Sequence, residues 1–237
     1  MSDNTTQNTE PKIQNYVIIV AGGSGTRMQS AVPKQFLLLN GLPVLMHTLA
    51  AFFNSETKPQ IILVLPKSFK TYWEELCAKY KFDVPHQVVE GGESRFHSVK
   101  NGLDKIETDH DAIVAVHDAV RPITSKASIE SSYKLAALNG NAITAVKSRD
   151  SVRQLNGGIT MHLNRDEIYL IQTPQTFQLS QLKTAYLQQY DQNFTDDASI
   201  VEKAGFKINL IEGSHQNIKI TFPEDIAVAE LFLGRSS

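Results

Sequence analysis

The stretch that decides the fold is YVIIVAGGSGTRMQSAVPKQF, residues 16–36. It opens with apolar and β-branched residues, 16–21, which are typical of a strand buried on both faces of a parallel sheet. Three glycines follow at once and let the backbone take φ > 0 and approach a ligand closely: Gly22, Gly23 and Gly25. Backbone N–H groups in such a turn can converge on an anion. Because Arg27 and Lys34 add two positive charges to the same loop, the stretch predicts a polyphosphate site at a strand end.

Two better-known glycine loops do not fit this stretch. The dinucleotide-binding fingerprint needs G-x-G-x-x-G or A, but Met28 stands at the third position after Gly23 and Gly25. The Walker A loop needs Gly-Lys-Ser/Thr, whereas Lys34 follows Pro33. A glycine turn with unrelated surface charges stays open as the alternative.

A second glycine turn, GGESR at 91–95, follows a predicted strand at 86–90 and precedes a predicted helix. In open α/β sheets, turns at the carboxyl ends of strands gather around the ligand crevice. Ser94 is suited to cap the helix. Arg95 and Ser98 lie one turn apart and can face the crevice together, although a helix-surface charge explains Arg95 equally well.

A third motif, HDAVRP at 117–122, follows the predicted strand 112–116. An aspartate just past a buried strand end is costly unless it is solvated, paired or metal-bound. Mg²⁺ prefers carboxylate and phosphate oxygens, so Asp118 is the candidate metal ligand. Arg121 carries a planar donor fork suited to phosphate. The alternative is a local ion pair between Asp118 and Arg121.

Composition and charge limit the class of protein. The chain has 237 residues, 41% of them hydrophobic, and a formal charge of −2, so no bulk basic field favours nucleic acid. A single cysteine, Cys77, indicates a reducing compartment, and we expect a cytoplasmic location. No signal peptide or membrane span is expected. We predict a disordered tail at 1–14 and one domain at 15–237.

The order of predicted strands and helices favours an α/β fold with three layers and a mainly parallel sheet. Residues 149–163 interrupt this order, because they alternate like strands around the turn Asn156-Gly157-Gly158. A polar hairpin with few core residues indicates an exposed loop. We also expect a helix over 179–190, an extended turn at Pro174 and a core strand over 207–211.

The run A-G-G-S-G-T-R-M-x4-P-K-Q-F, residues 21–36, resembles the signature of sugar- and polyol-phosphate nucleotidylyltransferases. P-K-Q-F, residues 33–36, narrows the resemblance to cytidylyltransferases acting on 2-C-methyl-D-erythritol 4-phosphate (MEP) and their ribitol 5-phosphate relatives. Further matches are GG-x-x-R-x-x-S, D-A-x-R-P, T-P-Q-x-F, T-D-D-A-S and N-I-K-x-T-x-P-E-D, so the likeness spans about 16–233. The form T-D-D-A-S favours the MEP enzymes.

The resemblance implies a Rossmann-like nucleotidyltransferase fold and transfer of CMP from CTP to MEP, with release of pyrophosphate, in the non-mevalonate isoprenoid pathway. It also implies Mg²⁺ as cofactor and a homodimer formed through a β-arm at about 148–168. A ribitol-5-phosphate cytidylyltransferase and a nucleotide-binding sensor without catalysis remain alternatives. A glycosyltransferase fits less well, because its acidic D-x-D motif is missing after His117.

The resemblance also assigns roles to individual residues. The catalytic cations are Arg27, Lys34, Arg165 and Lys219. The residues expected at the nucleotide are Ala21, Gly22, Gly23, Gly25, Gly91, Arg95, Ser98, Asp118 and Ala119. The residues expected at the second substrate are Asp118, Arg121, Ser151, Arg165, Thr173, Thr195 and Lys219. Ser151 stands where the family usually has threonine, so that assignment rests on the shared hydroxyl alone.

Overall fold

The computed structural model describes residues 13–22, 32–108 and 110–234. Gly23, Gly25, Arg27 and most of the predicted tail lie outside these ranges. Within them, no helix is both long enough and apolar enough to cross a membrane.

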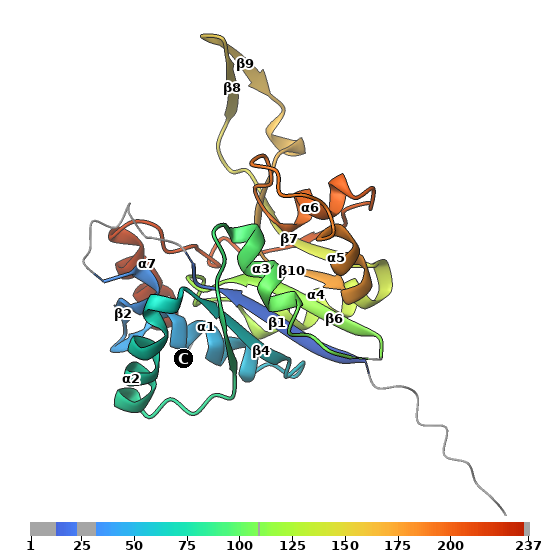
Figure 1. Ribbon diagram of the computed structural model, residues 1–237. Helices are drawn as coiled ribbons and strands as arrows, with labels where there is room; N and C mark the ends of the chain where they lie inside the picture. The colour runs from blue at the N-terminus through green and yellow to red at the C-terminus, as the bar shows by residue number, and fades with distance from the viewer. Residues whose placement is uncertain (1–12, 23–31, 109, 235–237) are drawn as a thin grey trace, which may run out of the picture.

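A seven-stranded sheet forms the centre of the molecule (Figure 1). The spatial order of its strands is β11-β7-β10-β6-β1-β4-β5. β10 runs antiparallel to both of its neighbours, and the other four pairings are parallel. The strands are β1 (Gln14–Val20), β4 (Gln60–Leu65), β5 (Gln87–Glu90), β6 (Ala112–Asp118), β7 (Asn141–Lys147), β10 (Tyr169–Gln178) and β11 (Leu210–Glu212). The prediction of a mainly parallel α/β sheet is confirmed.

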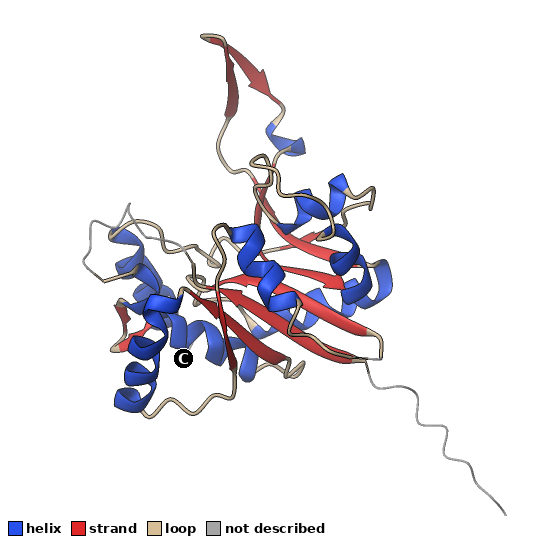
Figure 2. Ribbon diagram, in the orientation of Figure 1, coloured by secondary structure: helices blue, strands red, loops and turns tan. Residues whose placement is uncertain are grey.

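Helices cover both faces of this sheet, because side chains of a strand alternate between its faces. On β1, Val17 and Ile19 pack with α1 (Val44–Phe53), α2 (Lys70–Tyr80) and α4 (Lys126–Asn139). Ile18 points to the opposite core, which α3 (Arg95–Leu103), α5 (Leu179–Ala185) and α6 (Asp197–Lys203) complete. Figure 2 shows these helix layers against the strands. The result is the expected three-layer arrangement.

The last helix, α7 (Glu224–Gly234), belongs to a smaller third core. Its Ala229 packs with Leu39, Val44, Val120 and Ile220. Leu39 lies in a short hairpin of β2 (Leu38–Leu39) and β3 (Leu42–Pro43). This core anchors both the segment after β6 and the segment that precedes α7.

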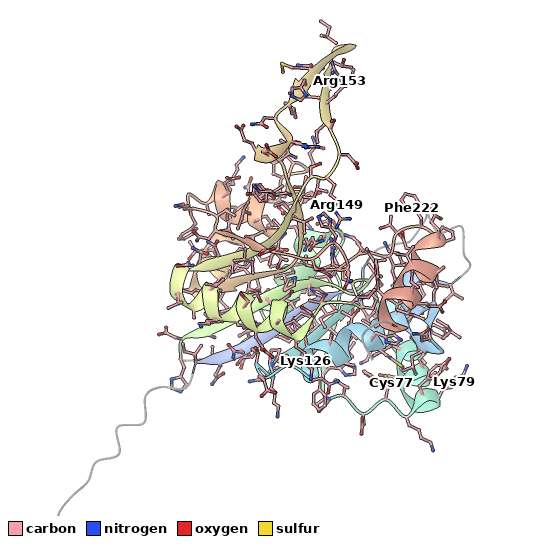
Figure 3. All side chains as sticks on the ribbon, turned by 180° about the vertical axis from the view of Figure 1, so that it is seen from behind. Cys77, Lys79, Lys126, Arg149, Arg153 and Phe222 are labelled. Atoms are coloured by element: carbon pink, nitrogen blue, oxygen red, sulfur yellow. The ribbon has the colours of Figure 1, made fainter. Side chains whose placement is uncertain are left out.

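A second hairpin, made of β8 (Val152–Asn156) and β9 (Ile159–Leu163), projects from the body (Figure 1). Gly157 and Gly158 form its turn with φ of 55° and 84°, values that glycine adopts without strain. Apolar side chains remain exposed along it: Leu155, Ile159 and Met161. Figure 3 shows Arg153 on the same projection.

Several predicted elements differ in the structure. The strand predicted at 112–116 continues to Asp118, which is the last residue of β6. The helix predicted over 179–190 ends at Ala185, after which Leu187 is 81% exposed and offers no packing to continue it. The predicted strand 207–211 is shorter and shifted, at Leu210–Glu212. The predicted turn at Pro174 lies inside β10, where the Thr173–Pro174 peptide is cis and a register shift between Ile171 and Gln175 accommodates the proline.

Candidate active site

The site lies where the strand order reverses. From β1 the chain adds β4 and β5 on one side and then crosses back to place β6 on the other. Crevices outside the carboxyl ends of strands at such a switch point are the usual ligand sites of open α/β sheets. The ends of β1, β5 and β6 accordingly bring both glycine segments and Asp118 to one crevice.

Two adjoining cavities occupy this crevice. The first, here called the glycine-loop cavity, is lined by Val20, Ala21, Gly22, Lys34, Gln35, Gly92, Glu93, Ser94, Arg95, Ser98, Asp118, Ala119, Val120 and Lys219. The second, here called the β10 cavity, is lined by Arg95, Asp118, Arg121, Ile171, Gln172, Thr173, Gln175, Thr195, Asp196 and Lys219. Arg95, Asp118 and Lys219 belong to both, so one charged cluster separates two spaces.

Hydrogen bonds fix the backbone of the glycine-loop cavity. The amide of Gln35 donates to the carbonyl of Ala21 over 3.0 Å. The N–H of Gly92 donates to Oγ of Ser98 over 3.1 Å, and a Cβ at Gly92 would collide with the side chain of His97. Ser94 caps α3 as its sequence predicts. The turn before α3 therefore needs glycine at 92, and its N–H groups are fixed by hydrogen bonds from Gly91 to the carbonyl of Leu65 and from Gly92 to Ser98.

Lys34 lies in a single 3₁₀ turn, Lys34–Phe36, that follows Pro33. The next aromatic residue, Phe36, is buried edge-on against Tyr72 of α2, with ring centroids 5.2 Å apart. This anchor keeps the turn at the crevice. Lys34 is itself largely buried and lines the glycine-loop cavity, which places a primary amine where the sequence predicts one.

Asp118 is the centre of the charged cluster. Its Oδ2 lies 3.1 Å from Nε of Arg121 and 3.1 Å from Nζ of Lys219. Burial alone would raise the pKa of Asp118, but the positive charges of Lys219, Arg95 and Arg121 outweigh it and hold the pKa well below its usual range. The carboxylate is therefore ionised at neutral pH. The local ion pair with Arg121 is present, and Lys219 joins it from 101 residues further along the chain than Asp118.

The residues present fit a magnesium ion that arrives with a nucleotide. Among the described residues, no group of three or more His, Cys, Asp or Glu side chains could hold a metal. Mg²⁺ is commonly bound through one or two carboxylates together with substrate phosphates, so it does not need such a group. Asp118 lines both cavities, and because its two cationic partners contact Oδ2, Oδ1 is the candidate ligand atom.

Arg95 is held from behind by an acid that the sequence analysis did not single out. Its Nη2 lies 2.5 Å from Oδ2 of Asp197, and the hydroxyl of Tyr186 donates to Oδ1 of Asp197 over 2.6 Å. Burial alone would lower the pKa of Arg95, but Asp197 overrides it and keeps the pKa above its ordinary value. Arg95 is therefore not a free helix-surface charge.

The structure brings most of the predicted residues together. Ala21, Gly22, Lys34, Arg95, Ser98, Asp118, Ala119, Arg121, Thr173, Thr195 and Lys219 line one cavity or both. Gly91 lies behind the lining, where a Cβ would come within 3.3 Å of Ser98 Oγ. Ser151 and Arg165 are exposed at the base of the hairpin and line neither cavity of their own chain.

Several cavity residues were assigned no role from the sequence. They are Gln35, Gln172 and Gln175; two of them stand in the quoted motifs P-K-Q-F and T-P-Q-x-F, but an uncharged amide does not by itself indicate a contact. Gln175 accepts a hydrogen bond from the N–H of Ala198 and donates to Asp196, so it fixes the start of α6 against β10. Asp196 caps α6 in a capping box with Ser199.

The comparisons with known proteins agree with this geometry. The model of the IspD family, described as 2-C-methyl-D-erythritol 4-phosphate cytidylyltransferase, matches residues 15–235. A curated protein of that name from Azobacteroides pseudotrichonymphae is 46% identical over 221 residues, covering 93% of this chain and 99% of the relative. Another from Bacteroides thetaiotaomicron is 46% identical and covers 93% of this chain and 100% of the relative.

Solved structures give the same result. The 4-diphosphocytidyl-2C-methyl-D-erythritol synthase of Anaerococcus prevotii superposes with a TM-score of 0.80 at 30% identity, covering 94% of this chain and 99% of that one. The 2-C-methyl-D-erythritol 4-phosphate cytidylyltransferase of Francisella tularensis superposes with a TM-score of 0.76 at 34% identity, covering 92% and 99%. From its matched length and these identities, the chain belongs to the 2-C-methyl-D-erythritol 4-phosphate cytidylyltransferase family.

Proposed function

We propose that this protein transfers CMP from CTP to MEP, forming 4-diphosphocytidyl-2-C-methyl-D-erythritol and pyrophosphate. The observation that carries the proposal is the cluster of Arg95, Asp118 and Lys219 between two cavities. A reaction between two phosphorylated molecules needs both in adjacent spaces with cations between them. Membership of the family supplies the identity of the two substrates.

The reaction needs little proton chemistry from the protein. A phosphate oxygen of MEP attacks the α-phosphorus of CTP, the bond from that phosphorus to the bridging oxygen breaks, and pyrophosphate leaves. The second pKa of a phosphate monoester is about 6, so the attacking group is already mostly a dianion at pH 7. The task of the site is to hold two polyanions in line and neutralise their charge.

The site residues divide between the two cavities. At the glycine-loop cavity, Ala21, Gly22, Arg95 and Ser98 would hold CTP, while Lys34 would stabilise the leaving pyrophosphate. Arg27 is proposed for the same task from outside the described residues. At the β10 cavity, the residues that would hold the phosphate of MEP are Arg121, Thr173, Thr195 and Lys219. Mg²⁺ bound at Asp118 would neutralise the triphosphate.

We further propose that the protein is a homodimer joined through the hairpin. The hairpin exposes Leu155 and Ile159, which are 69% and 77% accessible in the single chain. A partner subunit would cover such apolar side chains. The same contact would bring Ser151 and Arg165 to the neighbour's β10 cavity, which they do not reach in their own chain.

The test is pyrophosphate release by the purified protein with Mg²⁺, CTP and MEP. Parallel reactions replace MEP with ribitol 5-phosphate, or CTP with each of the other three nucleotides. Release with CTP and MEP alone is expected. A preference for ribitol 5-phosphate would change the substrate while keeping the chemistry, and absence of release in every reaction would reject the enzyme.

A further inference from the structure

Asn217 is a buried amide in the segment between β11 and α7, only 2% exposed. Its Nδ2 donates to the carbonyl of Thr173 over 2.9 Å and to Oε1 of Gln172 over 3.3 Å. Its Oδ1 accepts from the hydroxyl of Thr124 over 3.0 Å. One side chain therefore joins three segments: β10, the turn after β6, and its own.

The segment that Asn217 anchors is the one that carries Lys219. Residues 213–221 form neither helix nor strand, so no ladder of backbone hydrogen bonds fixes them. Other contacts flank Lys219 instead. On one side are the side chain of Asn217 and the carbonyl of Asn217, which accepts from Nη1 of Arg121 over 2.7 Å. On the other side, the N–H of Ile220 donates to the carbonyl of Val120 over 2.9 Å. Between them Nζ of Lys219 reaches Asp118.

The chemistry of the contact requires an amide. The carbonyl of Thr173 needs a hydrogen-bond donor, whereas the hydroxyl of Thr124 donates and needs an acceptor. Asparagine supplies both from one short side chain. Aspartate lacks the donor, and alanine lacks both and would leave buried polar groups without partners.

We propose that Asn217 is a positioning residue for the reaction, which acts by holding Lys219 at the boundary of the two cavities. The inference rests on the proposed function, because it concerns the alignment of the attacking phosphate. Lys219 has a flexible stem and 42% of its side chain is exposed, so its own contacts restrict it little. Alignment depends on the backbone, which the side chain of Asn217 helps to fix.

The chain contains a matched control. Asn141 is also fully buried, donating through Nδ2 to the carbonyl of Lys207 and to Gln181, and accepting at Oδ1 from the N–H of Asn209. It lines neither cavity. Asn141→Ala and Asn217→Ala thus remove comparable buried hydrogen bonds, one away from the site and one beside Lys219.

The test compares kcat/KM for MEP, with thermal unfolding measured on the same samples. Both variants should lower the melting temperature to a similar extent. Asn217→Ala should lower kcat/KM by about 10- to 100-fold, because a displacement of about 1 Å at a reacting centre can cost that much in rate. Asn141→Ala should leave it near the wild-type value. Equal kinetic losses in the two variants would overturn the proposal.

A double-mutant cycle separates positioning from general damage. In a Lys219→Ala background the amine is already gone, so Asn217→Ala should have little further effect on kcat/KM. Independent losses that multiply would show that Asn217 does not act through Lys219. If Asn217→Ala does not fold, Thr124→Val removes the hydroxyl that donates to Asn217, together with its contacts to His117 and the carbonyl of Arg121, and should give a smaller loss with the same dependence on Lys219.

The wild-type reaction distinguishes the two claims. No pyrophosphate release from the wild-type protein would reject the proposed function and this inference together. Release by the wild type with multiplicative losses in the cycle would reject the role of Asn217 alone.

Discussion

Arg95 of α3 and Asp197 of α6 form an ion pair although 102 residues separate them in the chain. Asp197 is fully buried, whereas 31% of the Arg95 side chain is exposed and lines both cavities. The neighbouring Asp196 lines the β10 cavity and is bonded to Gln175. The start of α6 therefore contacts Arg95 through Asp197 and lines the β10 cavity through Asp196.

Asp197→Ala should weaken both folding and nucleotide binding. A hydrogen bond to a charged group contributes about 1.5–3 kcal/mol to stability. The substitution also leaves the hydroxyl of Tyr186 without its acceptor. We expect a loss of that order in urea unfolding and a higher KM for CTP, because Arg95 is no longer held. The control is Asp191→Ala, which removes the exposed pair with Lys203 and should change neither quantity. An unchanged KM for CTP in Asp197→Ala would contradict the role given to the pair.

The fold was predictable from local patterns. The apolar run at 16–21 identified a buried strand, and Ile18 and Val17 do pack on opposite faces of the sheet. Glycine segments and Asp118 were marked by their position after such strands, which is why the crevice was predictable too. These features depend on residues that are close together in the chain, so the sequence shows them directly.

The partners of Arg95 and Lys219 were not predictable in the same way. Two acids before an apolar run look like helix caps in any protein, and Asp196 is one, so nothing distinguished Asp197 as a buried counter-ion. Asn217 stands two residues before Lys219 in the sequence, but its contacts with Thr173 and Thr124 depend on how distant segments meet. Pro174 predicted a turn, but β10 accommodates it through a local shift of register, and that shift depends on the neighbouring strand.

Lys34→Ala should lower turnover with little loss of stability. Removing one preorganised donor from a developing negative charge costs on the order of 10²–10³ in kcat. Lys34 lies at the cavity in a turn whose packing depends on Phe36, so the fold should remain. Turnover is measured at saturating CTP and MEP. Lys126→Ala, at the exposed start of α4 (Figure 3), is the control, and near-normal turnover in Lys34→Ala would contradict the assignment.

The pH dependence of kcat/KM for MEP should follow the substrate and not Asp118. The monoester loses its second proton near pH ~6, so the rate should rise from pH 5 to pH 7. Since the folded pKa of Asp118 lies below its unfolded value of about 3.9, its ion pairs are fully formed above that value and are lost only as pH falls further. Rates and melting temperatures measured from pH 5 to 8 check this. A parallel fall of both between pH 6 and 5 would point to the protein instead.

Cys77 should resist alkylation in the folded protein. Burial and then the charge of Glu74 raise the pKa of its thiol to about 11, so little thiolate exists at neutral pH. Cys77 lies on α2 (Figure 3) and is the single cysteine in the chain, so mass spectrometry reports this site alone. Iodoacetamide at pH 7.5 should react on the order of 10²-fold more slowly than in urea. Similar rates in both conditions would show that the thiol is not shielded.

Mixing two inactive variants tests whether the hairpin acts across a dimer. Lys34→Ala removes a residue of the body, and Arg165→Ala removes one of the hairpin base. In a two-fold dimer whose hairpins reach across, a mixed dimer has one site with both residues intact, so random exchange should restore about a quarter of the wild-type activity. If Arg165 served its own subunit, every site in the mixture would lack one residue, and mixing would restore nothing. Light scattering of the wild type checks the dimer itself. A Leu155→Glu, Ile159→Glu double variant should be a monomer, because a dimer would have to bury two unpaired charges in the contact of the hairpin.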